Sequence, residues 1–149
     1  MNSSKYKYCV VTGAFDVIHP GHILLLKEAA KRATNVIVLL QDDPTIDRDW
    51  KNKPIQTIDE RKMILSSIKY VDKIITYNTE KELIELLFTL CNKYKDGIVR
   101  LLGSEYRDGI VITGRDIMNL EFHTRNHEWS SSEMKQRILS RGTVKPSKK

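Results

Sequence analysis

The chain has 149 residues, 40% of them hydrophobic, which is enough for the core of one domain and too little for two. It shows no signal segment and no stretch as long as a membrane-spanning helix, so we expect a cytoplasmic protein without a membrane partner. Much of the net charge of +6 lies near the C-terminus, which predicts a domain over residues 1–140 and a poorly ordered basic tail over residues 141–149 rather than a nucleic-acid partner.

The first predicted elements frame a turn that contains two histidines. An apolar run over residues 6–12 predicts a strand, and Pro20 suits the first turn of a helix that extends to about Arg32, because its missing N–H would have no partner there. His19 and His22 are three residues apart and share one face at this helix N-terminus. Unpaired backbone N–H groups and the helix dipole favour an anion there, so the turn predicts a phosphate site.

The rest of the chain continues the alternation of strands and helices. Further strands are predicted over Asn35–Gln41, Val71–Thr76, Ile98–Leu102 and Leu120–His123, and helices after capping boxes at Thr57–Glu60, Thr79–Glu82 and Ser130–Glu133, the first of them ending near Ile68. The polar stretch Asp42–Gln56 is a long loop, and such loops are usually functional. This order predicts an α/β fold with a doubly wound, five-stranded parallel sheet and helices on both faces.

Two further expectations come from the same elements. Leucines at helical spacing after the second capping box predict a core-facing stripe. Cys9 and Cys91 are isolated in the sequence and are expected to be reduced thiols. In a doubly wound sheet, ligands bind beyond the carboxyl ends of the strands where the strand order reverses, and the histidine turn lies just past the first strand.

Three segments together resemble one enzyme family. Gly13–His22 (GAFDVIHPGH) is similar to the HxGH signature of the cytidylyltransferase-like nucleotidyltransferases, most closely in the form found in glycerol-3-phosphate cytidylyltransferase. Glu60–Asp72 resembles the family's second motif, and Arg125–Ser131 (RNHEWSS) resembles its closing motif. The resemblance covers most of the chain and implies a Rossmann-like HxGH nucleotidyltransferase fold.

The family implies transfer of a nucleotidyl group from a nucleoside triphosphate to a phosphorylated acceptor, with release of pyrophosphate. An acceptor oxygen attacks the α-phosphorus directly, so the protein positions the reactants and stabilises charge. The motif pattern favours CTP as donor and glycerol 3-phosphate, or a similar polyol or sugar phosphate, as acceptor. Mg²⁺ is implied with the triphosphate, without an assigned protein ligand, and a homodimer is implied because the family is commonly dimeric.

The resemblance also assigns site residues. The catalytic residues are His19, His22, Lys51, Lys53 and Arg125. The nucleotide-binding residues are Thr12, Gly13, Ala14, Phe15, Gly21, Gly103, Arg125, Trp129, Ser130 and Ser131, and the acceptor-binding residues are Asp16 and Arg61. Imidazoles suit the role because they donate hydrogen bonds and can gain a proton near neutral pH. Gly13 and Gly21 would let a phosphate approach the backbone closely.

Some positions depart from the cytidylyltransferase pattern and keep alternatives open. Ala14 stands where threonine is commoner, Trp129 replaces an aliphatic residue, and the segment after Gly103 differs in sequence and length. One alternative is an adenylyltransferase that uses ATP with FMN, a heptose phosphate or pantetheine phosphate. Another is a non-catalytic nucleotide- or RNA-binding module, suggested by the basic charge balance. His123 and His127 are given no role and are expected at the surface.

Overall fold

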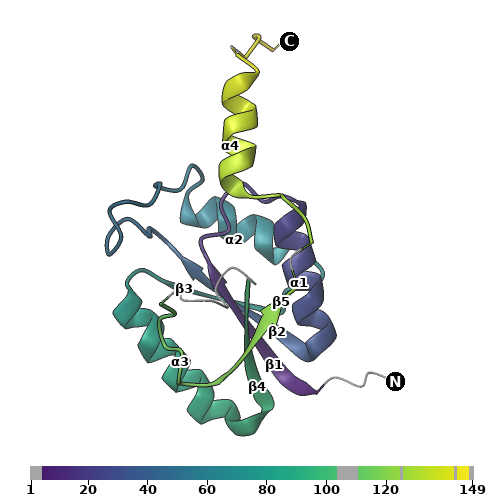
Figure 1. The fold of residues 1–149 in the computed structure, drawn as a ribbon, viewed down its shortest axis with the longest axis vertical. Coiled ribbons are helices and arrows are strands. Elements are labelled where there is room, and N and C mark those ends of the chain that lie inside the picture. Colours follow the sequence, from purple (N-terminus) through teal and green to yellow (C-terminus); the bar gives the residue numbers. More distant parts are fainter. Residues whose placement is uncertain (1–4, 104–110, 125, 143, 148–149) are drawn as a thin grey trace.

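The computed structural model describes residues 5–103, 111–124, 126–142 and 144–147. Within these ranges, five parallel strands form one sheet in the order β3-β2-β1-β4-β5 (Figure 1). The strands are β1 (Tyr6–Gly13), β2 (Ala33–Gln41), β3 (Lys73–Tyr77), β4 (Ile98–Gly103) and β5 (Asn119–His123). The order runs outward in one direction from β1 and in the other from β4, so it reverses between these two strands. The predicted α/β fold with a five-stranded parallel sheet is confirmed.

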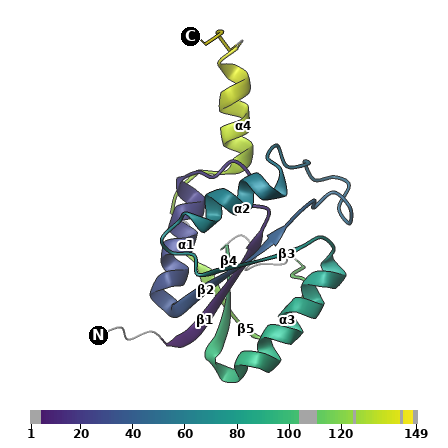
Figure 2. The ribbon, with the colours of Figure 1, turned by 180° about the vertical axis from the view of Figure 1, so that it is seen from behind.

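Helices cover both faces of the sheet (Figures 1 and 2). They are α1 (Pro20–Arg32), α2 (Ile58–Ser66), α3 (Glu80–Tyr94) and α4 (Ser131–Ser140), and a short 3₁₀ helix spans Lys95–Gly97. Val11 of β1 packs in one core with Leu26 of α1 and Leu65 of α2. Val10, the preceding residue, points to the other core, where Leu87 belongs to the predicted leucine stripe of α3. This alternation is why the central strands are apolar on both faces.

Three predicted boundaries are displaced by about two residues. The second helix ends at Ser66 rather than near Ile68, β2 begins at Ala33 rather than Asn35, and β3 begins at Lys73 rather than Val71. Asp72 explains the late start of the strand. Its N–H donates to the carbonyl of Val36 at 3.0 Å and its carboxylate accepts from the Val36 N–H at 2.7 Å. Asp72 therefore closes the connection onto β2 before the ladder of β3 begins.

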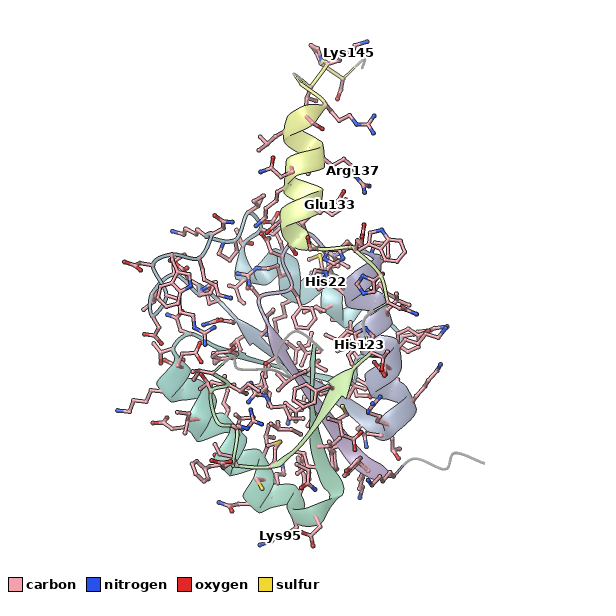
Figure 3. The ribbon with its side chains drawn as sticks, in the orientation of Figure 1. His22, Lys95, His123, Glu133, Arg137 and Lys145 are labelled. Atoms are coloured by element: carbon pink, nitrogen blue, oxygen red, sulfur yellow. The ribbon has the colours of Figure 1, made fainter. Side chains whose placement is uncertain are left out.

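All three predicted capping boxes form the hydrogen bond to the N-cap hydroxyl, but two of them lack the return bond from the N-cap N–H to the glutamate carboxylate. Thr57, Thr79 and Ser130 each accept a hydrogen bond from the backbone N–H three residues later. The carboxylate returns to the N-cap only in the helix that Thr57 opens. Glu82 accepts instead from the N–H of Asn78 at 2.6 Å. In α4, Glu133 pairs with Arg137 at 2.9 Å (Figure 3).

Helix α4 projects from the rest of the domain (Figures 1 and 2). None of its residues is buried, and its attachment lies in its first turns. The hydroxyl of Ser131 donates to the carbonyl of Asp16 at 2.9 Å, and the Lys135 ammonium contacts the Asp16 carboxylate at 3.0 Å. Across the described ranges, no helix is long and apolar enough to cross a membrane.

Candidate functional site

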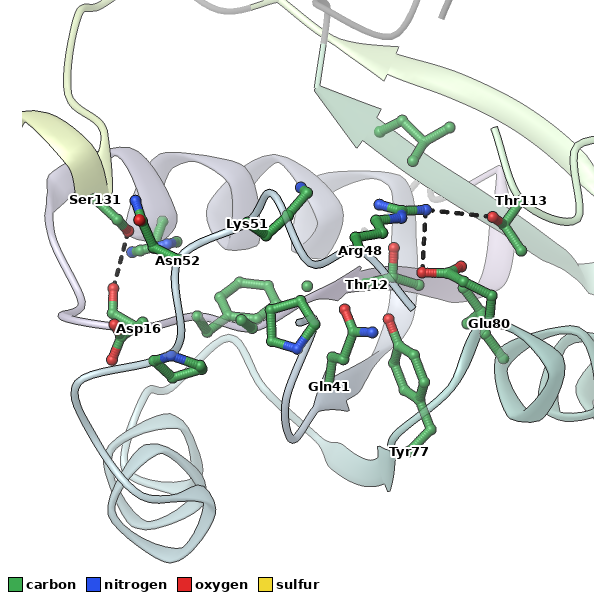
Figure 4. A pocket seen from close by; sticks show the side chains of 18 of the residues that line it. Thr12, Asp16, Gln41, Arg48, Lys51, Asn52, Tyr77, Glu80, Thr113 and Ser131 are labelled. Carbon is green, nitrogen blue, oxygen red and sulfur yellow. Dashed lines mark hydrogen bonds and ion pairs between the residues drawn. The ribbon is translucent and has the colours of Figure 1, made fainter. Parts of the chain in front are cut away.

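A cleft of about 660 Å³ opens at the carboxyl ends of the central strands, between the loop over residues 42–56 and the first turns of α3 and α4 (Figure 4). Its floor includes Thr12 from β1, Gln41 from β2 and Arg100 from β4. The strand order reverses between β1 and β4, so the cleft lies where the sequence predicts a ligand. Its volume is within the range of small-molecule sites, about 300–1,000 Å³.

The turn between β1 and α1 is strained and held by contacts from distant segments. Phe15 and Val17 both have a φ of +49°, in the left-handed region that non-glycine residues rarely adopt. Each such residue costs about 1–3 kcal/mol and persists only where its surroundings hold it. The N–H of Val17 donates to the side chain of Gln56 at 2.9 Å, and the ring of Phe15 is buried in the core. The 42–56 loop thus fixes the conformation of the turn.

Asp16 is the centre of this arrangement. Its carboxylate accepts from the backbone N–H groups of Ile55 at 2.8 Å and Gln56 at 3.0 Å, and it contacts the ammonium of Lys135 at 3.0 Å. Burial alone would raise the pKa of Asp16, but these hydrogen bonds and the ammonium outweigh it and hold the pKa below its ordinary value. Asp16 lines the cleft and joins the turn, the loop and α4. Its contacts are those of a positioning residue, while its predicted contact with the acceptor stays a prediction.

The two motif histidines cap α1 with their own rings. Nδ1 of His19 accepts from the N–H of Gly21 at 3.0 Å, and Nδ1 of His22 accepts from the N–H of His19 at 3.2 Å. Their ring centroids are 3.9 Å apart. Because each Nδ1 accepts, the ring proton of each imidazole is on Nε2, which is then a hydrogen-bond donor. Capping and ligand binding use different nitrogens of the same ring.

His22 is neutral in the free protein near neutral pH. Burial, followed by the nearby His19, lowers the pKa of His22 to about 3. The expectation that this imidazole gains a proton near neutral pH is therefore wrong for the free protein, because the pair is packed too closely and too deeply. The neutral ring still offers Nε2–H to an anion in the cleft, which His22 lines.

Gly21 is required by the packing of two imidazoles. A Cβ at this position would lie 2.8 Å from the rings of both His19 and His127. Close approach of a phosphate, the predicted reason for this glycine, stays a prediction. His123, expected at the surface, is instead 8% exposed, and its Nδ1 contacts the carboxylate of Glu28 in α1. The surface expectation is wrong because β5 places this side chain against α1.

Arg61 lies outside the lining of the cleft. Its side chain is 1% exposed and donates to the carbonyls of Ala14 at 2.9 Å, Gln41 at 2.6 Å, Asp42 at 2.7 Å and Gln56 at 3.1 Å. These carbonyls lie where β1 and β2 end and where the loop rejoins α2. The hydrogen bonds from Arg61 back to the main chain explain why an arginine stands in the first turns of α2. The acceptor role of Arg61 has no support in its contacts.

The structure brings together half of the predicted site residues. Those that line the cleft are Thr12, Gly13, Ala14, Phe15, Asp16, His22, Lys51 and Ser131. Among the described residues, those outside its lining are His19, Gly21, Lys53, Arg61, Gly103, Trp129 and Ser130. Lys51 is thus favoured over Lys53 as the loop lysine. Arg125 and the segment Ser104–Tyr106 lie outside the described residues.

Two arginines of the cleft were not predicted from the sequence. Arg48 comes from the loop and Arg100 from the middle of β4, where it is 3% exposed. Arg100 had a usable signal, since it is a charged residue inside a strand whose neighbours are apolar. Arg48 had none, because it is one of several charged residues in a polar loop.

Comparisons with known proteins identify the family of this chain. Residues 10–130 match the cytidylyltransferase-like family model. A bifunctional protein HldE of Gluconacetobacter diazotrophicus is 33% identical over 109 residues, 71% of this chain and 21% of that protein. The FAD synthase of Aciduliprofundum boonei is 41% identical over 66 residues, 44% of this chain and 44% of that protein. The FAD synthase of Ferroglobus placidus is 32% identical over 95 residues, 64% of this chain and 58% of that protein. The chain therefore spans less than half of the first two of these relatives.

Solved structures share the fold. A lipopolysaccharide core biosynthesis protein from Thermoplasma volcanium has a TM-score of 0.54 at 23% identity, covering 91% of this chain and 88% of that one. A bifunctional NMN adenylyltransferase/ADP ribose pyrophosphatase from Francisella tularensis has a TM-score of 0.66 at 17% identity. The match covers 94% of this chain and 43% of that one. The named relatives are HldE proteins and FAD synthases, so the finer likeness to glycerol-3-phosphate cytidylyltransferase gains no support. With the family model matched over most of its length, the chain belongs to the cytidylyltransferase-like family of nucleotidyltransferases.

Proposed function

We propose that this protein transfers the adenylyl group of ATP to the phosphate of a small acceptor. An acceptor phosphate oxygen attacks the α-phosphorus, the bond from that phosphorus to the bridging β-oxygen breaks, and pyrophosphate leaves. The observation that carries the proposal is the histidine pair at the start of α1. His19 and His22 have tautomers fixed by capping, and His22 lines the cleft.

In this proposal the protein supplies donors and cations around the phosphates. Nε2–H of His22 and the first N–H groups of α1 stabilise charge on the triphosphate and on the departing pyrophosphate. Lys51 adds positive charge from the loop, and Arg125 has the same role from the closing motif. Ser131, whose hydroxyl is held by the Asp16 carbonyl, borders the nucleotide.

Mg²⁺ belongs to the proposal as the partner of the triphosphate. Within the described ranges, no group of three histidine, cysteine or acidic residues could hold a metal ion. That donor set fits an ion held chiefly by substrate oxygens, since Mg²⁺ commonly takes few protein ligands. When bound, the ion neutralises charge on the phosphates. We also propose a cytoplasmic homodimer, in keeping with the family.

The choice of ATP rests on the relatives. FAD is FMN joined to AMP through a pyrophosphate bond, so an enzyme that makes it by nucleotidyl transfer uses ATP. FAD synthases are among the named relatives, which favours ATP over the CTP that the motif pattern placed first. CMP transfer from CTP to glycerol 3-phosphate remains the second candidate, supported by the form of the Gly13–His22 motif.

A pyrophosphate-release assay tests the proposal. ATP, CTP, GTP and UTP are each incubated with Mg²⁺ and FMN, a heptose phosphate, pantetheine phosphate or glycerol 3-phosphate. We expect release with ATP and one of the first three acceptors. Release with CTP and glycerol 3-phosphate alone would support the second candidate. Triphosphate or RNA binding without release in any combination would contradict transfer and favour the binding-module alternative.

A further inference from the structure

The outer part of α4 is exposed on all sides. We call residues 136–149 the outer segment; the structure describes 136–142 and 144–147 of it, and all of these are exposed. The contacts that attach α4 to the domain, from Ser131 and Lys135 to Asp16, lie in its first turns. Helices of fewer than about 12–15 residues are marginal in water without tertiary packing, and α4 has 10. Within the described residues, the outer end of α4 lacks such packing.

The outer segment is strongly basic. It contains no aspartate or glutamate, and its cations are Arg137, Arg141, Lys145, Lys148 and Lys149. Arg137 pairs with Glu133 at 2.9 Å, but an exposed ion pair contributes little and exchanges readily for another anion. Figure 3 shows Arg137 and Lys145 on the part of the chain that projects from the domain. This charge favours an anionic partner.

The same segment exposes aliphatic side chains beside these cations. Ile138 is 54% exposed, Leu139 is 72% exposed and Val144 is 87% exposed. Ile138 follows Met134 by four residues, so the two side chains lie on one face of α4. A helix with an aliphatic face and neighbouring cations is typical of segments that lie on the surface of an anionic bilayer.

Composition and charge discriminate among anionic partners. Proteins that bind single-stranded nucleic acids commonly stack bases on aromatic side chains, and no aromatic residue follows Trp129 in this chain. A second copy of the chain carries a net charge of +6, so it presents these cations with a positive molecule. A bilayer with anionic lipids offers negative headgroups to the cations and an acyl boundary to Ile138 and Leu139.

The shape of the molecule leaves this segment accessible to a flat surface. Helix α4 runs along the longest axis and carries the outer segment away from the sheet (Figures 1 and 2). The cleft meets α4 only at its base, through Ser131, Ser132 and Lys135. A surface in contact with the outer segment therefore does not cover these cleft residues.

We propose that the outer segment binds the surface of a bilayer that contains anionic lipids. Arg137, Arg141 and Lys145 pair with lipid phosphates, while Ile138 and Leu139 lie against the acyl boundary. Such peripheral contact needs no membrane-spanning helix, and it departs from the expectation of a protein without a membrane partner. The inference is independent of the proposed function, because none of these five residues lines the cleft.

Co-sedimentation with vesicles tests the contact. We expect the unmodified protein to bind vesicles of equal parts phosphatidylcholine and phosphatidylglycerol and not vesicles of phosphatidylcholine alone, and to bind more weakly as the salt concentration rises. The triple variant Arg137→Gln/Arg141→Gln/Lys145→Gln should bind about 100-fold more weakly, since each cation at such a surface contributes roughly fivefold. Ile138→Ser/Leu139→Ser should weaken binding at least about tenfold.

A matched control removes the same charge elsewhere. Lys62→Gln/Lys69→Gln/Lys73→Gln changes three exposed lysines outside α4 and should leave vesicle binding nearly unchanged. Sedimentation with neither kind of vesicle, equal sedimentation with both, or equal losses in the control and the α4 variants would overturn the proposal.

Two further measurements separate the bilayer from other partners and from the transfer reaction. Binding of a single-stranded RNA oligonucleotide without vesicle binding would overturn the proposal, as would self-association through Ile138 and Leu139, measured by light scattering, without vesicle binding. In solution, the triple variant should release pyrophosphate at the rate of the unmodified protein. Loss of vesicle binding with full release thus supports the bilayer contact, and release is scored separately from it.

Discussion

Arg61 stabilises the ends of two strands through hydrogen bonds to four main-chain carbonyls. Arg61→Met leaves these buried acceptors without donors, so we expect the free energy of unfolding to fall by about 3–5 kcal/mol. Urea denaturation measures the change. Lys62→Met, an exposed neighbour in the same helix, should change stability by less than about 0.5 kcal/mol. Equal effects of the two substitutions would contradict the structural role of Arg61.

The two nitrogens of His22 can be tested separately. Asparagine places its amide oxygen near the position of Nδ1 and can keep the cap on His19, while glutamine can place an N–H near the position of Nε2. His22→Asn should keep the melting temperature and lower turnover roughly 10²–10³-fold, the usual cost of losing a donor to developing charge. His22→Gln should retain more of the turnover. A folded Asn variant with full activity would show that Nε2–H does not contact the reacting phosphates.

The buried imidazole of His22 also predicts acid sensitivity. The pKa of His22 falls from an ordinary 6.5 to about 3 on folding. Between these values the unfolded chain binds the proton and the folded protein does not, so stability decreases as the pH falls from 6.5 toward 3. The slope from this group is at most about 1.4 kcal/mol per pH unit.

Urea unfolding of the wild type and of His22→Asn at pH 7, 6 and 5 measures this contribution. The variant should lose less stability over this range than the wild type. Asp16, whose pKa is lowered, stays ionised in both states above about pH 5 and adds little there. Parallel pH dependences of the two proteins would contradict the shift.

At the scale of the element, the end of α3 holds a lysine in a conformation that suits glycine. Lys95 has φ 51° and ψ −130° and is exposed, far from His22 (Figure 3). Lys95→Gly should therefore raise the free energy of unfolding by about 1 kcal/mol. Lys93→Gly, inside the helix, should lower it by about 1 kcal/mol. Thermal denaturation compares the two, and a loss of stability in both would show that Lys95 is unstrained.

The elements themselves were largely predictable from local patterns. The strands β1 and β2 contain the apolar runs of residues 8–11 and 36–40, and the hydroxyl caps at Thr57, Thr79 and Ser130 mark the starts of helices. The bonds from the N-cap N–H to the glutamate carboxylate were less predictable, because several donors lie within reach of a carboxylate in one helical turn. Glu82 instead accepts from the N–H of Asn78, and Glu133 pairs with Arg137.

At the scale of the whole molecule, the two thiols report on global packing. Burial raises the pKa of Cys9 to about 12, and this side chain is fully buried between sheet and helices. Cys91 is half-buried, with its Sγ donating to the Ile117 carbonyl at 3.3 Å. A thiol reagent such as Ellman's should modify Cys91 in the native protein and Cys9 only on unfolding. Equal rates for the two would contradict the buried position of β1.

The candidate site was predictable where its residues are adjacent in sequence and less so where the fold assembles them. The Gly13–His22 motif located the cleft because strand, turn and helix follow one another. The burial of Arg61 and His123 depended on which distant carbonyls and carboxylates the fold brings near them. The positive φ of Phe15 and Val17 had no local signal, since neither residue type favours it. The 42–56 loop contacts the backbone of Val17, and the core holds the ring of Phe15.

The shared attachment at Asp16 has a consequence for how this site can evolve. One carboxylate holds both the end of the 42–56 loop and, through Lys135, the projecting helix. A substitution of Asp16 therefore disturbs the 42–56 loop and α4, which both border the cleft, at the same time. Diversification of substrate preference is easiest in the middle of the loop, around Lys51, where new side chains reach the cleft without disturbing that attachment.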